Sequence, residues 1–89
     1  MILSLGNKAR KALDDLEPKQ FKQVAARIFG LQREPHPHDA KHLAGHPGYR
    51  RIDVGEFRIC YRLNGEIIEV PVVARRNDDA AYRQLNRRA

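Results

Sequence analysis

The second half of the chain carries a set of arginines whose type and spacing could do chemistry on a phosphate. Residues 45–89 contain nine arginines and no lysine, whereas residues 1–44 contain five lysines and three arginines, and each part has a net charge of +3. A guanidinium is a planar fork of donors that binds phosphate or carboxylate at two points, whereas lysine is a point charge. The pattern therefore favours recognition of phosphate or carboxylate. A general arginine bias from genomic base composition is the plainer alternative.

A predicted three-stranded meander over residues 49–74 positions these arginines. Gly55-Glu56 and Asn64-Gly65 are both signals for two-residue hairpin turns. If both turns have two residues, Val54 opposes Phe57, Asp53 opposes Arg58 and Leu63 opposes Glu66. Pro71 cannot donate to a strand ladder, so a bulge or an unpaired flank is expected there.

Alternation of side chains along these strands predicts one apolar face and one charged face. The apolar face comprises Ile52, Val54, Phe57, Ile59, Tyr61, Ile68, Val70 and Val72, and the charged face comprises Arg51, Asp53, Arg58, Cys60, Arg62 and Glu69. The apolar face should pack on helices. Burial of so many charges would be costly, so we expect the charged face to be open to solvent or to a ligand.

Three arginines are expected to meet on the charged face. Arg51 and Arg58 come from adjacent strands, and Arg76 follows the third strand. Converging guanidinium groups can clamp a phosphate and stabilise a phosphorane-like transition state, and a tyrosine such as Tyr82 can stack on an unpaired base. The alternative is a cross-strand ion pair between Asp53 and Arg58 on a wet sheet, worth about a few tenths of a kcal/mol.

The histidines and the single cysteine are the other candidates for chemistry. His38, His42 and His46 recur at a spacing of four, which could converge on a metal in a continuous helix. Prolines and glycines interrupt this stretch, so we predict a stiffened loop without a metal, from which His46 could reach the charged face. An arginine beside Cys60 would lower the pKa of its thiol, but a small half-buried thiol is the favoured interpretation.

The remaining elements predict an α+β fold. A strand at residues 2–5 precedes two amphipathic helices packed as a hairpin, with Pro18 in the first turn of the second helix. Their apolar positions are Ala9, Ala12, Leu13 and Leu16, then Phe21, Val24, Ala25 and Ile28. Residues 33–48 form a connector anchored by Leu43, and a short helix is expected after the cap residues 77–79.

Length and composition restrict the class of protein. A chain of 89 residues buries only about 60–65% of its unfolded surface, so we expect one domain over residues 1–89. Hydrophobic and charged contents of 42% and 31% are those of a folded chain. No apolar run approaches the ~20 residues of a membrane helix, and a lone cysteine suits a reducing cytoplasm.

The stretch from His42 to Tyr82 resembles the RelE/ParE superfamily of bacterial toxins. The matching features are H-L-A-G, then Y-R-R-I-D-V-G-E-F-R-I-C-Y, then a hydrophobic strand closing on Arg75-Arg76, with a tyrosine six residues later. The resemblance implies the toxin of a type II toxin–antitoxin system in the cytoplasm, with a RelE-like fold and no cofactor. It also implies an antitoxin partner that covers the basic groove, and a hetero-oligomer of the two that binds operator DNA.

In the RelE branch, the resemblance implies a ribosome-dependent messenger RNA endonuclease. Such toxins enter the ribosomal A site, where the ribose 2′-hydroxyl attacks the adjacent phosphate and leaves a 2′,3′-cyclic phosphate and a 5′-hydroxyl. Catalytic roles then fall on Arg51, Arg58, Arg76 and Tyr82, and RNA contacts on Arg50, Arg62, Arg75 and His46. The best-studied members of the branch carry a lysine, implicated in activating the 2′-hydroxyl, where this chain has Asp53. Asp53 would serve as the base itself or only orient Arg58, and Arg50 or His46 could supply the missing function.

Two further functions stay open. A ParE-type inhibitor of DNA gyrase needs no nuclease site, and a degenerate toxin would only bind its antitoxin. Arginine and tyrosine at the positions of Arg76 and Tyr82 favour the RelE branch.

Overall fold

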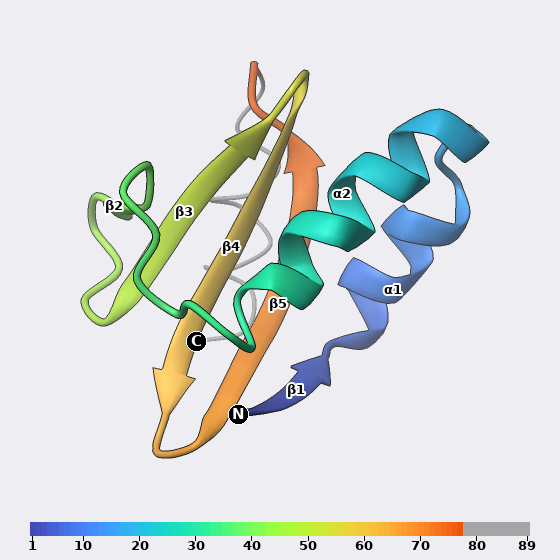
Figure 1. Ribbon diagram of the computed structural model, residues 1–89. Coiled ribbons are helices and arrows are strands. Elements are labelled where there is room, and N and C mark those ends of the chain that lie inside the picture. Colours follow the sequence, from blue (N-terminus) through green and yellow to red (C-terminus); the bar gives the residue numbers. More distant parts are fainter. Residues whose placement is uncertain (78–89) are drawn as a thin grey trace.

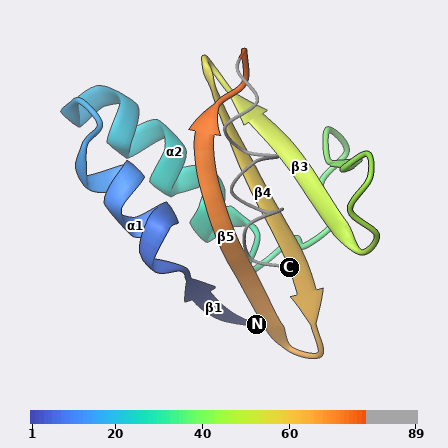
Figure 2. The same ribbon diagram turned by 180° about the vertical axis from the view of Figure 1, so that it is seen from behind.

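The computed structural model describes residues 1–77. Its elements are β1 (Ile2–Leu5), α1 (Asn7–Asp14), α2 (Pro18–Gly30), β2 (Lys41–His42), β3 (Tyr49–Val54), β4 (Phe57–Asn64) and β5 (Ile67–Arg75). The strands form one sheet in the order β1-β5-β4-β3-β2, with β1 parallel to β5 and the other neighbours antiparallel. The two helices cover one face of this sheet (Figures 1 and 2). The predicted α+β class is confirmed, whereas the predicted C-terminal helix lies outside the described residues.

The core lies between the helices and the sheet. Helix spacing of three and four places the apolar side chains of each helix on one stripe, and alternation does the same for the strands. The buried cluster includes Ala9, Leu13, Val24, Ile28, Ile52, Ile59, Tyr61, Ile68, Val70 and Val73. Pro18 begins α2, where its missing N–H costs nothing. Neither helix is long and apolar enough to cross a membrane, within the part of the chain described.

The register of the first hairpin is the predicted one, and that of the second differs. Val54 pairs with Phe57 and Asp53 with Arg58, so Gly55-Glu56 is the turn. In the second hairpin, however, Leu63 pairs with Ile68 rather than with Glu66. The turn lies one residue further along the chain than predicted, which moves the partner of Leu63 by two residues, because Gly65, with φ of +60°, takes the first central position.

A bulge in β5 changes which side chains face the helices. Cys60 pairs with Val72 and Arg62 with Glu69, so the strand opposite Tyr61 carries an extra residue at Pro71. This confirms the irregularity expected at that proline. An extra residue shifts the alternation by one position. Val72 therefore lies on the far face with Cys60, and its predicted place in the helix-facing core was wrong.

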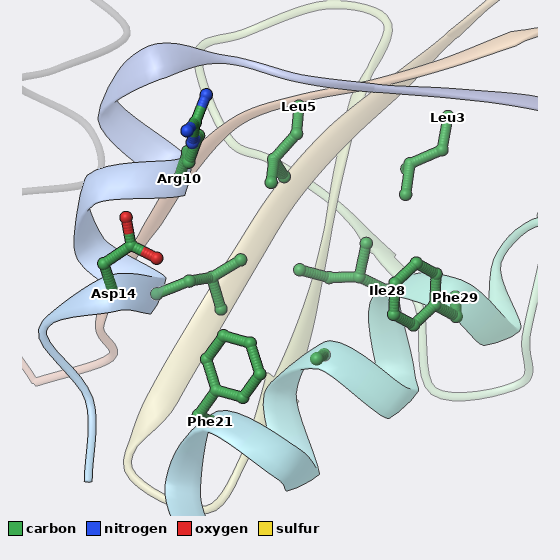
Figure 3. A pocket seen from close by; sticks show the side chains of 9 residues that line it. Leu3, Leu5, Arg10, Asp14, Phe21, Ile28 and Phe29 are labelled. Atoms are coloured by element: carbon green, nitrogen blue, oxygen red, sulfur yellow. The ribbon is translucent and has the colours of Figure 1, made fainter. Parts of the chain in front are cut away.

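The helix side of the molecule carries an apolar groove of about 250 Å³ between β1, α1 and α2 (Figure 3). Leu3 and Leu5 line it from β1, and Ile28 and Phe29 from α2. Phe21, which the pattern places with the buried side chains, also lines the groove and is 43% exposed. The groove therefore belongs to the helix layer and is separate from the charged face of the sheet.

Candidate phosphate-binding site

We call the sheet surface turned away from the helices the arginine face, and its centre is the ion-pair cluster of Arg51, Asp53, Arg58 and Arg76. Arg51 and Asp53 lie two residues apart on β3, so their side chains share a face, and Arg58 is the direct partner of Asp53 on β4. Arg76 follows β5, and its backbone N–H donates to the carbonyl oxygen of Glu56 at 2.9 Å. This bond holds the end of β5 beside the β3–β4 turn.

One carboxylate stands at the middle of this cluster. The Nε of Arg58 donates to Oδ1 of Asp53 at 2.9 Å. Oδ2 of the same carboxylate lies 3.7 Å from Nη1 of Arg51 and 3.9 Å from Nη1 of Arg76. The side chain of Arg58 is 15% exposed, whereas that of Arg76 is 49% exposed, so the cluster opens to solvent on the Arg76 side. The structure therefore brings together the three arginines expected to converge.

The cluster keeps Asp53 ionised and keeps its net charge positive. The hydrogen bond from Arg58 lowers the pKa of Asp53, and the charges of Arg58, Arg51 and Arg76 add to this effect against an opposing cost of burial. A carboxylate whose pKa is lowered and whose oxygen already accepts a hydrogen bond is a weak proton acceptor. Three cations and one anion leave an excess of positive charge that attracts a phosphate.

A second group of side chains lies at the other end of the arginine face. The guanidinium of Arg62 lies 5.6 Å from the centroid of the Tyr49 ring, and its Nε donates to Oε1 of Glu69 at 2.5 Å. The ring of His46 meets the Tyr49 ring edge-on, with centroids 6.5 Å apart. Sequence reasoning named Arg62 and His46 but missed Tyr49, although the predicted register of the first hairpin already paired Tyr49 with Arg62.

The other predicted site residues lie elsewhere. Arg50 alternates to the opposite face of β3 from Arg51 and is paired with Tyr61. Arg75 forms an ion pair of 3.1 Å with Glu56 and covers the Phe57 ring. Tyr82 lies outside the described residues. In residues 1–77, no three side chains of the metal-ligating types lie close enough together to hold an ion.

Cys60 lies on the arginine face but is fully buried beneath Leu43 and against Val72. Burial raises the pKa of its thiol to about 11, and the nearby positive charges of Arg58 and Arg51 only partly oppose this. The two arginines do act to lower this pKa, but desolvation outweighs their charges, and the thiol is fully buried rather than half-buried as the sequence favoured.

This burial predicts slow alkylation of Cys60. A pKa raised from 9.0 to about 11 lowers the thiolate fraction at pH 8 by about 100-fold. We expect iodoacetamide to modify the native protein at least that much more slowly than the protein in guanidinium chloride, as followed by mass spectrometry. Equal rates in the two conditions would contradict the burial of Cys60.

Known proteins resemble this chain more in their structure than in their sequence. No protein-family model matches the chain, and no curated protein matches it. Among solved structures, a chain of the toxin–antitoxin complex RelBE2 from Mycobacterium tuberculosis is 26% identical, with a TM-score of 0.72, covering 84% of this chain and 96% of that one. A free-state mutant of the E. coli toxin RelE is 20% identical, with a TM-score of 0.81, covering 98% and 95%.

The ParE branch matches as well. A chain of the chromosomal ParDE system from P. aeruginosa is 21% identical, with a TM-score of 0.69, and the match covers 84% of this chain and 95% of that one. In each of these matches the alignment takes in almost the whole of the other chain. The resemblance seen in the sequence is thus confirmed, and the chain is of the RelE/ParE toxin superfamily by its fold.

Proposed function

We propose that this chain is the toxin of a toxin–antitoxin pair and that it cleaves messenger RNA in the ribosomal A site. The observation that carries the proposal is the convergence of Arg51, Arg58 and Arg76 within 4 Å of the one Asp53 carboxylate. An arrangement that surrounds one oxyanion with three guanidinium groups suits the phosphodiester of an RNA strand equally well. Similarity to chains of RelBE complexes supports the toxin role and an antitoxin partner.

In the proposed reaction, the ribose 2′-oxygen forms a bond to phosphorus and the bond from phosphorus to the 5′-oxygen breaks. The 2′-hydroxyl gives up its proton, and the leaving 5′-oxygen gains one. Arg51 and Arg58 would hold the non-bridging oxygens as charge builds on them, and the more exposed Arg76 would lie nearest the leaving oxygen. The ribosome contributes by fixing the RNA backbone in line for attack.

Asp53 has a positioning role in this proposal. Its oxygens already accept from Arg58 and face Arg51 and Arg76, so it holds the guanidinium groups in place rather than taking the proton. Tyr82 is retained as a stacking or proton-transferring residue from the sequence alone. The antitoxin would cover the arginine face, because a chain of net charge +6 attracts an acidic partner. The toxin and antitoxin together would bind operator DNA.

Induction of the chain without its antitoxin tests the proposal. We expect translation to stop and ribosome-bound messages to carry new 5′-hydroxyl ends, mapped by ligation-based sequencing. A matched control is Arg33→Ala, which removes one positive charge from an exposed position outside the arginine face and should leave the cuts unchanged. Intact messages together with broken chromosomal DNA would overturn the proposal in favour of gyrase inhibition, which the match to the ParDE chain keeps as the second candidate.

A further inference from the structure

A row of polar side chains crosses the arginine face at the end away from Asp53. Ser4 pairs with Glu69 across β1 and β5, Glu69 with Arg62 across β5 and β4, and Arg62 with Tyr49 across β4 and β3. Direct partners on adjacent strands place their side chains on the same face. These four side chains line a small hollow of about 80 Å³. The proposed cleavage chemistry uses none of them.

The row is held in place by the fold. Arg62 is fixed by the carboxylate of Glu69 on one side and by the Tyr49 ring on the other. Tyr49 is fixed through its backbone, which accepts from the N–H of Leu43 at 3.0 Å and donates to the carbonyl oxygen of His46 at 3.1 Å. Side chains that are ordered before a ligand arrives lose less entropy when they bind it.

We infer that this row is a subsite for one unpaired nucleobase of the RNA, and we call it the base shelf. The inference rests on the proposed function, since it assigns a second contact to the same RNA. The chemistry fits a base: aromatic rings and guanidinium planes stack on unpaired bases, and arginine and carboxylate groups bond to their edges. Arg62 supplies donors and Glu69 acceptors side by side, which matches a guanine edge that carries both a carbonyl and N–H groups.

The distance between the base shelf and the ion-pair cluster agrees with this assignment. Tyr49 and Asp53 lie on the same face of β3, four residues apart, which corresponds to ~13 Å at the strand rise of about 3.3 Å. Arg51 of the ion-pair cluster lies midway between them on β3, and Cys60 and Val72 occupy the corresponding positions on β4 and β5. The base on the shelf would therefore belong to a nucleotide close to the cleaved phosphate, whose oxygens Arg51 would contact.

Binding of a short single-stranded oligoribonucleotide, 2′-O-methylated throughout so that it cannot be cleaved, tests the base shelf. Fluorescence anisotropy should show that Tyr49→Leu weakens binding about tenfold, which is the usual contribution of one stacked base. The matched control is Phe29→Leu, which removes an aromatic ring from the helix side, where it is 59% exposed, and should bind like wild type. Guanine at the sensitive position should bind better than the other bases, and Glu69→Gln should reduce this preference.

A series of RNAs with one abasic nucleotide makes the test independent of folding. At one position, removal of the base should weaken binding by the wild-type protein about tenfold, and the Tyr49→Leu effect should vanish on that RNA. If no abasic position matters and Tyr49→Leu binds like wild type, the base shelf is overturned, while a loss of binding in Arg58→Ala would keep the proposed function. If wild type binds no RNA, alone or on ribosomes, both ideas fail together.

Discussion

Arg58→Ala is expected to lower the rate of messenger cleavage on ribosomes by about 100- to 1,000-fold, the loss typical of removing one preorganised donor from a transition state. Arg58 is the least exposed of the three clustered arginines and the one bonded directly to Asp53. It lies between Arg51 and Arg76 in contact with the same carboxylate. A phosphate bound there would lose its central contact in the variant.

Single-turnover cleavage of a defined message on purified ribosomes measures this loss. Arg58→Lys keeps the charge but not the two-point fork, so it should recover binding more than rate. The fold should survive in Arg58→Ala, because Arg51 and Arg76 still neutralise Asp53, and circular dichroism checks this point. Cleavage at the wild-type rate by a folded Arg58→Ala protein would remove the arginine face from the mechanism.

The convergence of the arginines was predictable because it follows from a local signal. A two-residue turn at Gly55-Glu56 fixes each partner along β3 and β4, and with them the pairing of Asp53 with Arg58. The same arithmetic failed one hairpin later, since Asn64-Gly65 and Gly65-Glu66 are both acceptable turns. Both turns place Ile68 on the helix-facing side, so the alternation of side chains could not choose between them.

Features that depend on contacts between residues distant in the sequence were harder to predict. A bulge at Pro71 was one of the expected outcomes, but the shift that it causes in the alternation of side chains was not predicted. Because of that shift, Val73 rather than Val72 packs under the helices. The burial of Cys60 required Leu43 to fold back onto the sheet. Tyr49 was missed for a different reason. Its partner Arg62 was predicted to contact RNA through its charge alone, and the Tyr49 ring beside that charge was not considered.

Asp53→Asn is expected to preserve the cleavage rate and to strengthen RNA binding about 10- to 100-fold. The substitution removes a negative charge a few ångströms from the proposed phosphate position, and a partly buried charge pair at that distance is worth about 1–3 kcal/mol after screening. The asparagine side-chain oxygen can still accept from the Nε of Arg58. Anisotropy with the 2′-O-methylated RNA and single-turnover cleavage measure the two effects separately. A rate loss of ~100-fold would instead identify Asp53 as the general base.

The pH dependence of stability gives an independent test of Asp53. Its pKa is lowered in the folded protein, chiefly by the hydrogen bond from Arg58, from a value of about 3.9 in the unfolded chain. Just below pH 4 the unfolded state therefore binds more protons, so the contribution of Asp53 is fully present above this pH and is lost as pH falls through the folded pKa. We expect the difference in Tm between wild type and Asp53→Asn to stay constant from pH 8 to about 5 and to change only below about 4. A change between pH 5 and 8 would mean that Asp53 titrates near neutrality, as a general base does and as a carboxylate tied to Arg58 does not.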